Sequence, residues 1–215
     1  MKPYYDRNGI TLYLGDCREV LPQLTEKVDL VLTDPPYNGD LNYGVMINDS
    51  RDWADYNLWL KGIIQQSEQL SNGPVLFFLS KPGLINICAT YPPKWVGSWL
   101  SSPCNPAGNV NGCLMIPMWE PFLVYGNLNN VRARLKDAYK VNHNTENLSH
   151  PCPKPVSLMA QIIQCGEWQS ILDPFLGSGT TAVAAKKLGR RCIGIEINED
   201  YLKIAIQRLA QEVLF

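Results

Sequence analysis

Residues 170–181 restrict the fold more than any other stretch, because an apolar run passes through a glycine turn into a helix. Gly177 and Gly179 lie in that turn, and the next apolar run, residues 191–195, ends at Glu196. A strand that leads through a helix to a second strand predicts parallel pairing, since parallel strands need a crossover connection. Strand-like and helix-like runs alternate along most of the chain. This alternation predicts an α/β domain with a mainly parallel sheet covered on both faces.

Hydrophobic periodicity places the individual elements. The expected strands cover residues 10–14, 28–32, 75–79, 95–100, 119–125, 170–172 and 191–195. The expected helices cover residues 17–24, 53–70, 81–89, 155–165, 180–188 and 199–213. Pro121 inside its strand suggests an edge strand or a bulge. The tryptophans Trp53, Trp59, Trp95 and Trp99 are expected in the core.

The chain length fits one domain covering residues 1–215, with residues 126–149 as a small insertion. Apolar residues make up 46% and charged residues 18%, an ordinary soluble composition. The formal charge is −1, so no global positive field attracts a polyanion. No apolar run approaches the length of a signal peptide core or a membrane span. The seven cysteines form no Cys-x-x-Cys pair, which favours reduced thiols in a cytoplasmic compartment.

The glycine turn predicts a binding site for a nucleoside-containing cofactor. Glycines let a ligand approach the backbone, and the following helix N-terminus favours negative charge. Glu196 lies 196 − 177 = 19 residues after the first glycine, where an acid would accept ribose hydroxyl groups. A nicotinamide dinucleotide fits this pattern as well as another adenosyl cofactor does. A structural turn with a solvated Glu196 is the simpler alternative.

A second chemical motif, residues 33–38, follows the apolar run at residues 28–32. It combines the acid Asp34 with two prolines and the aromatic ring of Tyr37. Such a set predicts a clamp for a planar, polar group, a device for which a dehydrogenase has no use. The alternative is a plain turn in which Asp34 caps the backbone.

Together, residues 33–38 and 173–181 resemble the β class of amino-group DNA methyltransferases, with the catalytic motif first and the cofactor glycines last. These enzymes methylate adenine N6 or cytosine N4 with S-adenosylmethionine. Residues 14–17, 119–125 and 150–155 resemble further elements of that family. The resemblance implies a Rossmann-like methyltransferase fold in circularly permuted order. Its sheet would have about seven strands, mainly parallel, with an antiparallel last strand.

The resemblance implies that Asp34, Pro35, Pro36 and Tyr37 are the catalytic residues. An exocyclic base amine is a poor nucleophile because its lone pair is delocalised into the ring. The Asp34 carboxylate and the Pro35 carbonyl would accept its N–H groups and stabilise the positive charge that builds on nitrogen. Tyr37 would stack on a base extruded from the duplex. No metal is implied.

The implied cofactor is S-adenosyl-L-methionine. Its candidate binding residues are Asp16, Cys17, Asp34, Lys154, Asp173, Phe175, Gly177, Ser178, Gly179, Thr180 and Glu196. Glu196 would bind the ribose and Asp16 the adenine amino group, while Gly177 and Gly179 would line the methionine end. Thr180 is a candidate donor to the cofactor carboxylate.

Two of these assignments have a structural alternative. Asp173 would either border the cofactor pocket or order its loop. Lys154 would either reach the cofactor carboxylate or belong to a proline-rich segment that only shapes a helix start. His150, in that same segment, is expected to orient the loop.

The candidate DNA-binding residues are Arg132, Arg134, Lys136 and Lys140, in the polar segment 126–149. With Asp137 and Glu146 the local charge is 4 − 2 = +2. A solvated loop is the alternative. Because the segment is short for a recognition domain, a very short recognition sequence, a dimer, or help from residues 38–50 and 101–117 are all open.

The expected activity is site-specific methylation of a flipped adenine at N6 in double-stranded DNA, without membrane association. An acid at the start of the clamp fits adenine enzymes, whereas cytosine-N4 enzymes more often carry Ser there. Cytosine N4, RNA, and a non-catalytic adenosyl-binding or DNA-binding regulator are the alternatives. The resemblance also raises a homodimer and a companion restriction endonuclease as partners. The expected location is the bacterial cytoplasm, or the host cytoplasm for a phage enzyme.

Overall fold

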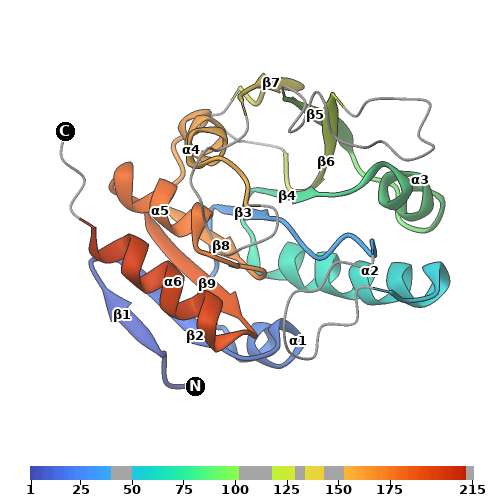
Figure 1. Cartoon of the computed structure of the whole chain (residues 1–215). Coiled ribbons are helices and arrows are strands. Elements are labelled where there is room, and N and C mark those ends of the chain that lie inside the picture. Colours follow the sequence, from blue (N-terminus) through green and yellow to red (C-terminus); the bar gives the residue numbers. More distant parts are fainter. Residues whose placement is uncertain (40–49, 102–117, 129–133, 143–152, 212–215) are drawn as a thin grey trace, which may run out of the picture.

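The structure, a computed structural model, describes residues 1–39, 50–101, 118–128, 134–142 and 153–211. These residues form a nine-stranded sheet in the order β1-β2-β9-β8-β3-β4-β6-β5-β7 (Figure 1). The strands are β1 (Tyr5–Arg7), β2 (Ile10–Leu14), β3 (Leu30–Thr33), β4 (Pro74–Phe78), β5 (Trp95–Leu100), β6 (Trp119–Gly126), β7 (Ala138–Lys140), β8 (Ser170–Asp173) and β9 (Arg191–Glu196). The helices are α1 (Cys17–Val20), the short 3₁₀ helix η1 (Leu21–Gln23), α2 (Trp53–Leu70), α3 (Lys81–Thr90), α4 (Val156–Gln164), α5 (Thr180–Lys187) and α6 (Glu199–Ala210).

The centre of the sheet is parallel. Strands β2, β9, β8, β3 and β4 pair in parallel, while β6 runs antiparallel between β4 and β5. From β3 the chain passes through α2 to β4, and from β8 it passes through α5 to β9 on the other side. The winding direction therefore reverses between β3 and β8. Ligands of open α/β sheets bind at such a switch point, outside the carboxyl ends of the strands.

Each central strand contributes to two hydrophobic cores, because successive side chains point to opposite faces of the sheet. Leu30 and Leu32 are buried in the core that contains residues of α4, α5 and α6. Val31, between them, is buried in the core that contains residues of α1, α2 and α3. Covering both faces of β3 leaves only its carboxyl end free to face a ligand.

Side-chain caps fix where the helices begin. The Asp52 carboxylate accepts a hydrogen bond from the backbone N–H of Ala54 at 2.8 Å and starts α2. At α6, the Asn198 side chain accepts one from the N–H of Asp200 at 2.9 Å. Among the helices of the described residues, none combines the length and the apolar character that a membrane crossing needs.

The Rossmann-like sheet that the resemblance implied is confirmed, and its antiparallel strands are β6 and the short edge strand β1. The sheet of the described residues has two more strands than expected, because β1 and β7 extend its edges by three residues each. Strands this short show no periodic pattern. The sequence suggested that Pro121 marks an edge strand or a bulge. The prediction of an edge strand is wrong, since β6 is paired on both sides. Pro121 lies beyond the last register pair with β4, where its carbonyl accepts the Leu79 N–H at 3.1 Å.

Gly179 precedes α5 in a left-handed conformation, with φ of 85°. A Cβ atom at this position would lie 2.6 Å from the Cβ of Ala205 in α6. Both the backbone conformation and the contact between α5 and α6 therefore require glycine. This packing role is an alternative to the sequence prediction that Gly179 lines the cofactor pocket.

We predict that Gly179→Ala lowers the free energy of unfolding by about 1–3 kcal/mol, because the added methyl group meets Ala205 at a strained backbone position. Denaturant unfolding followed by circular dichroism measures this loss. The matched control is Gly62→Ala inside α2, where an added Cβ meets nothing within 4 Å. It should raise stability by about 0.5–1 kcal/mol. A Gly179→Ala protein as stable as the wild type would contradict the packing argument.

Candidate active site

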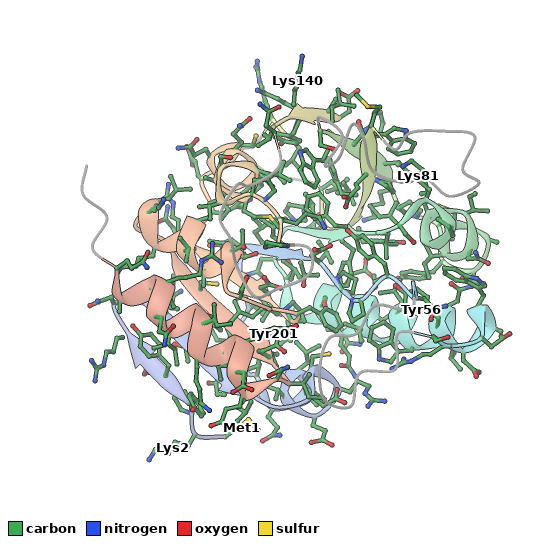
Figure 2. The ribbon with its side chains drawn as sticks, in the orientation of Figure 1. Met1, Lys2, Tyr56, Lys81, Lys140 and Tyr201 are labelled. Atoms are coloured by element: carbon green, nitrogen blue, oxygen red, sulfur yellow. The ribbon has the colours of Figure 1, made fainter. Side chains whose placement is uncertain are left out.

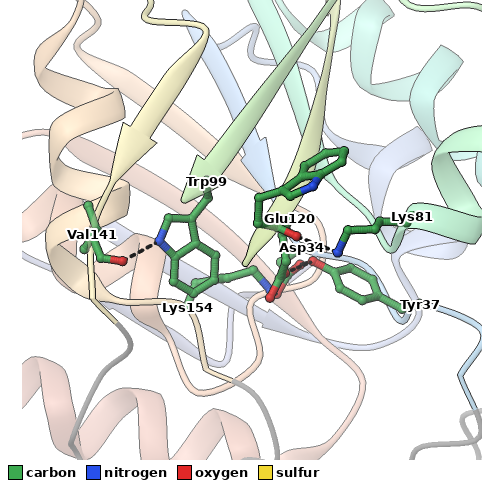
Figure 3. Close-up of polar contacts among 8 residues, drawn as sticks. Asp34, Tyr37, Lys81, Trp99, Glu120, Val141 and Lys154 are labelled. Carbon is green, nitrogen blue, oxygen red and sulfur yellow. Dashed lines mark hydrogen bonds and ion pairs between the residues drawn. The ribbon is translucent and has the colours of Figure 1, made fainter. Parts of the chain in front are cut away.

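Asp34 follows β3 at the carboxyl edge of the sheet, where side chains from distant segments hold its carboxylate (Figure 3). The Tyr37 hydroxyl donates to Asp34 Oδ1 at 2.6 Å, and Lys154 Nζ donates to Asp34 Oδ2 at 2.7 Å. Lys154 Nζ also lies 3.2 Å from Oε2 of Glu120 in β6. The Tyr37 hydroxyl is 3.1 Å from that same oxygen. We call Asp34, Tyr37, Glu120 and Lys154 the acid cluster.

The acid cluster holds two carboxylates and one ammonium group, a formal charge of 1 − 2 = −1. Burial raises the pKa of Asp34, and Lys154 opposes this shift. Burial disfavours the ammonium form of Lys154, but the attraction of Asp34 and Glu120 outweighs it and raises the pKa. Burial and the two carboxylates raise the pKa of Tyr37 well above its usual value, so Tyr37 stays a protonated donor.

The two prolines of the motif have different surroundings. The Tyr56 hydroxyl donates to the Pro36 carbonyl at 2.7 Å, which ties the turn to α2. Within the described part of the chain, no hydrogen bond reaches the Pro35 carbonyl. Pro35 lines the large cavity described below, so its carbonyl is available to a ligand donor.

Glu196 ends β9, and its carboxylate is hydrogen-bonded to the backbone of the glycine turn. The backbone N–H groups of Gly177 and Asn198 donate to its carboxylate at 2.7 and 2.8 Å. The residue is only 7% exposed, and burial raises its pKa to about 7 although these hydrogen bonds favour the charged form. Glu196 is therefore a fixed acid that titrates near neutral pH at the wall of the cavity.

Asp173 ends β8 and joins it to β3. Its Oδ1 accepts the Thr33 hydroxyl at 2.5 Å and the Phe175 N–H at 3.1 Å. Burial raises the pKa of Asp173 to about 6, and the hydrogen bonds of Thr33 and Thr181 oppose this shift. These contacts favour the alternative in which Asp173 orders the glycine turn.

Asp16 caps α1 and is engaged by Arg18. The Arg18 backbone N–H donates to Oδ1 at 2.8 Å, and its guanidinium reaches Oδ2 at 2.5 Å. The hydrogen bond with Arg18 lowers the pKa of Asp16 despite partial burial. An adenine amino group at Asp16 would share this carboxylate with Arg18.

A cavity of about 250 Å³ opens between the end of β3 and the glycine turn. Asp34 and Gly177 both line it, although 143 residues separate them in sequence (177 − 34). The other lining residues that the sequence singled out are Asp16, Cys17, Pro35, Pro36, Tyr37, Lys154, Phe175 and Glu196. A smaller cavity of about 40 Å³ is also lined by Asp34 and Gly177. The structure thus brings the two predicted motifs to one site.

Four of the predicted cofactor residues do not line the large cavity: Asp173, Ser178, Gly179 and Thr180. Arg208 Nη1 of α6 donates to the Ser178 carbonyl at 2.7 Å and to Thr180 Oγ1 at 3.3 Å. Ser178 and Thr180 line only the smaller cavity, together with Asp173. Gly179 lines neither of these two cavities and packs on Ala205 instead. The contact with α6 therefore explains why residue 179 is a glycine. Ser178 and Thr180 can contact only the part of a ligand that enters the smaller cavity.

The sequence did not assign several residues of the large cavity. These are Glu120, Arg18, Arg51, Trp59, Tyr201 and the apolar wall residues Ile195 and Ile197. The Trp59 ring lies 4.5 Å from the Arg51 guanidinium carbon and 5.6 Å from the Phe175 ring. Trp59 is thus part of the cavity wall rather than only of the core. Glu120 lies within residues 119–125, which resemble an element of the family, so the sequence did contain a signal for it. Helical periodicity could not single out Trp59.

Trp95 corrects another core prediction, since its side chain is 58% exposed on β5. Trp99, four residues later, is 1% exposed and belongs to the hydrophobic core. Because side chains alternate along a strand, Trp95 and Trp99 lie on the same face of β5. Trp95 is the first residue of β5, and the next residue, Val96, is also exposed.

Three of the four predicted DNA-binding residues lie in the described residues, and Arg132 lies outside them. Arg134, Lys136 and Lys140 are exposed, and Lys140 ends the edge strand β7 (Figure 2). The next residue, Val141, accepts a hydrogen bond from Trp99 Nε1 at 2.7 Å (Figure 3). The Trp99 ring is in turn 5.8 Å from Lys154 Nζ. His150 also lies outside the described residues.

Comparison with known proteins relates this site to a family. Residues 127–207 match a family model described as DNA methylase. The type II methyltransferase M2.DpnII of Streptococcus pneumoniae is 31% identical, and the match covers 98% of this chain and 93% of that protein. M.ScaI of Streptomyces caespitosus is 29% identical over 98% of this chain and 84% of its own length.

Solved structures agree with this relationship. The crystal structure of an M1.HpyAVI–SAM complex has a TM-score of 0.71 and 26% identity, covering 94% of this chain and 100% of that one. The PvuII cytosine-N4-specific DNA methyltransferase shares the fold, with a TM-score of 0.77 at 16% identity, covering 100% of this chain and 91% of that one. On these similarities and on the motifs that meet at one cavity, the chain belongs to the amino-group DNA methyltransferase family.

Proposed function

We propose that this protein transfers a methyl group from S-adenosylmethionine to N6 of a flipped adenine in double-stranded DNA. The observation that carries the proposal is the shared cavity, which is bordered by the Asp34 carboxylate on one side and by Gly177 and Glu196 on the other. A cavity at the switch point of the sheet suits a nucleoside ligand. Its acids and the adjacent Pro35 carbonyl are acceptors that suit an amino group.

The residues present fit S-adenosylmethionine. Glu196 offers a fixed carboxylate for the ribose hydroxyls, and Ile195, Ile197 and Phe175 give apolar walls for a planar ring. Gly177 brings bare backbone to the cavity, which permits close approach of the methionine part. The acid cluster has a formal charge of −1, which complements a sulfonium cation.

When bound, S-adenosylmethionine supplies a sulfonium methyl group: the acceptor nitrogen forms the new N–C bond, the C–S bond breaks with its electron pair left on sulfur, and the nitrogen then loses a proton. Asp34 and the Pro35 carbonyl would accept the two N–H groups of the base and hold the nitrogen lone pair toward the methyl carbon. Preorganised acceptors of this kind contribute about 3–4 kcal/mol each when charge develops next to them. The ionised Asp34 is also the nearest group that could take the released proton.

The target base has to leave the duplex, because the acceptors lie inside a concave cavity. Tyr37 lines this cavity, and its hydroxyl bonds the Asp34 carboxylate. We propose that one side of the Tyr37 ring stacks on the base while its hydroxyl orients the acid. Adenine is favoured by the acid that begins the motif. Cytosine N4 is the alternative acceptor, since it also presents an amino group beside an unprotonated ring nitrogen.

We assign DNA binding to the basic segment around β7, as part of the proposal that residues 126–149 act in target recognition. Lys140 lies at the carboxyl end of β7, and β7 is parallel to β5. This end of the sheet is the end where Asp34 lies. The remainder of the proposal is a cytoplasmic enzyme that acts beside a companion restriction endonuclease, as a monomer or as a homodimer.

The first prediction concerns the reaction itself. Wild-type protein incubated with mixed-sequence DNA and S-adenosylmethionine should produce N6-methyladenine at one short sequence, read by modified-base mapping. Asp34→Asn should lower the rate at least about 100-fold, because the amide places a donor where an acceptor is needed. The exposed Asp55→Asn change in α2 is the matched control. N4-methylcytosine would move the acceptor to cytosine, and the absence of any methylated base would favour the non-catalytic regulator.

A second prediction follows from the raised pKa of Glu196, about 7. Ribose hydroxyls donate to the ionised carboxylate, so affinity for S-adenosylmethionine should rise as the pH increases from about 6 to 7.5, and binding should release a proton in that range. Calorimetry in buffers of different ionisation enthalpy measures both effects. Glu196→Gln should bind more weakly and without the proton release. An unchanged release in the variant would assign it to another group.

A third prediction concerns DNA. Replacing Arg134, Lys136 and Lys140 together by Ala should weaken binding and lower the salt slope of log Kd by about 0.9 for each lost phosphate contact. Fluorescence anisotropy at several salt concentrations gives the slope. Lys187→Ala with Lys203→Ala removes exposed lysines from α5 and α6 as a control. Equal slopes for the wild type and the triple variant would place the DNA elsewhere.

A further inference from the structure

Lys154 is buried in a position that its proposed contact with the cofactor does not explain. Its side chain is 4% exposed, and its Nζ atom lies 2.7 Å from Asp34 and 3.2 Å from Glu120. The Tyr37 ring centre is 4.8 Å from the same nitrogen, and the rings of Phe78 and Trp99 are 5.7 and 5.8 Å away. Two carboxylates and three aromatic rings therefore surround the ammonium group.

We propose that Lys154 and Glu120 are positioning residues that hold the Asp34 carboxylate, ionised and fixed in orientation, for methyl transfer. This inference rests on the proposed function and assigns to Lys154 a role different from binding the cofactor carboxylate. Glu120, from the antiparallel strand β6, is the second carboxylate that contacts the ammonium group, at 3.2 Å.

The contacts fix both oxygens of Asp34. Tyr37 donates to Oδ1 and Lys154 donates to Oδ2, so the carboxylate cannot rotate without breaking one of the two bonds. Each carboxylate oxygen has two lone pairs, so each can still accept a donor from the cavity. A hold of this kind matters because misplacing a reacting group by about 1 Å can cost about 100-fold in rate.

Charge explains why the positioning group is a cation. Asp34 and Glu120 share the Tyr37 hydroxyl, whose single proton can serve only one of them at a time. Without Lys154, the two carboxylates would lie close together with no cation between them, and the like charge of Glu120 raises the pKa of Asp34. A protonated Asp34 would present a donor to the base amine. Lys154 thus opposes the protonation of Asp34.

The other charged or titratable groups near Asp34 come from several elements. The negative charge of Asp34 contributes to the raised pKa of Asp173 in β8. The other titratable groups that line the large cavity are Asp16, Arg18, Arg51, Glu196 and Tyr201. None of these is within ion-pair distance of Asp34 among the described residues. The response of Asp34 to pH should therefore depend first on Lys154 and Glu120.

The experiment compares Lys154→Met, Glu120→Gln and the double variant in single-turnover methylation at saturating S-adenosylmethionine and DNA. We expect Lys154→Met to lower the rate about 100-fold and to move the acid limb of its pH–rate profile up by at least about one pH unit. Glu120→Gln removes the like charge and should move the limb to lower pH. The double variant should return the limb toward the wild-type position and recover part of the lost rate.

Calorimetry of S-adenosylmethionine binding and thermal unfolding accompany the kinetics. Binding affinity should stay within about threefold of the wild type in Lys154→Met, since its methionine side chain preserves volume and the cofactor is not its partner. Lys187→Met, the same change at an exposed position of α5, should leave rate, limb and affinity unaltered. If Lys154→Met does not fold, the shift of the Glu120→Gln limb decides the proposal alone.

Two results would overturn the inference. One is a Lys154→Met protein with a wild-type pH profile and much weaker cofactor binding, which would make Lys154 a ligand of the cofactor carboxylate. The other is a Glu120→Gln profile that coincides with that of the wild type. Failure of the proposed function looks different, because wild-type protein would then transfer no methyl group to DNA at all.

Discussion

The parallel pairing of β3 with β8 is the constraint on which the site depends. Leu30 and Val31 of β3 are in register with Ile171 and Leu172 of β8, so both strands end at the same edge. The Thr33 hydroxyl then donates to the Asp173 carboxylate at 2.5 Å and links the carboxyl ends of the two strands. Because the winding direction reverses at this pair, no helix covers the edge, and the acid motif and the glycine turn face each other across a cavity.

Buried charge is the second theme of the structure. The sheet edge collects acids whose desolvation would be costly if each stood alone. The acids differ in how they are compensated: Asp34 by an ammonium group, Asp16 by a guanidinium, and Glu196 and Asp173 mainly by hydrogen-bond donors. The last two keep raised pKa values of about 7 and 6. Among the described residues, Glu196 and Asp173 have no cationic partner, whereas Lys154 opposes the rise in the pKa of Asp34 that burial causes.

Much of the fold could be predicted from local pattern, and the failures have local causes. Helix α2 coincides with its predicted bounds because a capping acid and a long apolar period mark both ends. The strands β1 and β7 were missed because three residues contain no period. Pro121 was taken to mark an edge strand or a bulge, because the sequence does not show that β6 has a paired strand on each side. Gly179 was taken for a ligand contact, but its nearest neighbour is Ala205, a residue whose approach no sequence spacing reveals.

The sequence by itself determined the motifs to which we assign the chemistry, since the acid–proline–aromatic motif and the glycine turn are contiguous and each follows a recognisable strand. It also determined the alternation of elements that makes the central sheet parallel. Only the tertiary structure decided what surrounds Asp34, because Glu120 and Lys154 reach it from β6 and from the start of α4. Electrostatic partners are chosen by distance in space, and distance in space between separate elements follows from strand order and register, which a linear pattern does not contain.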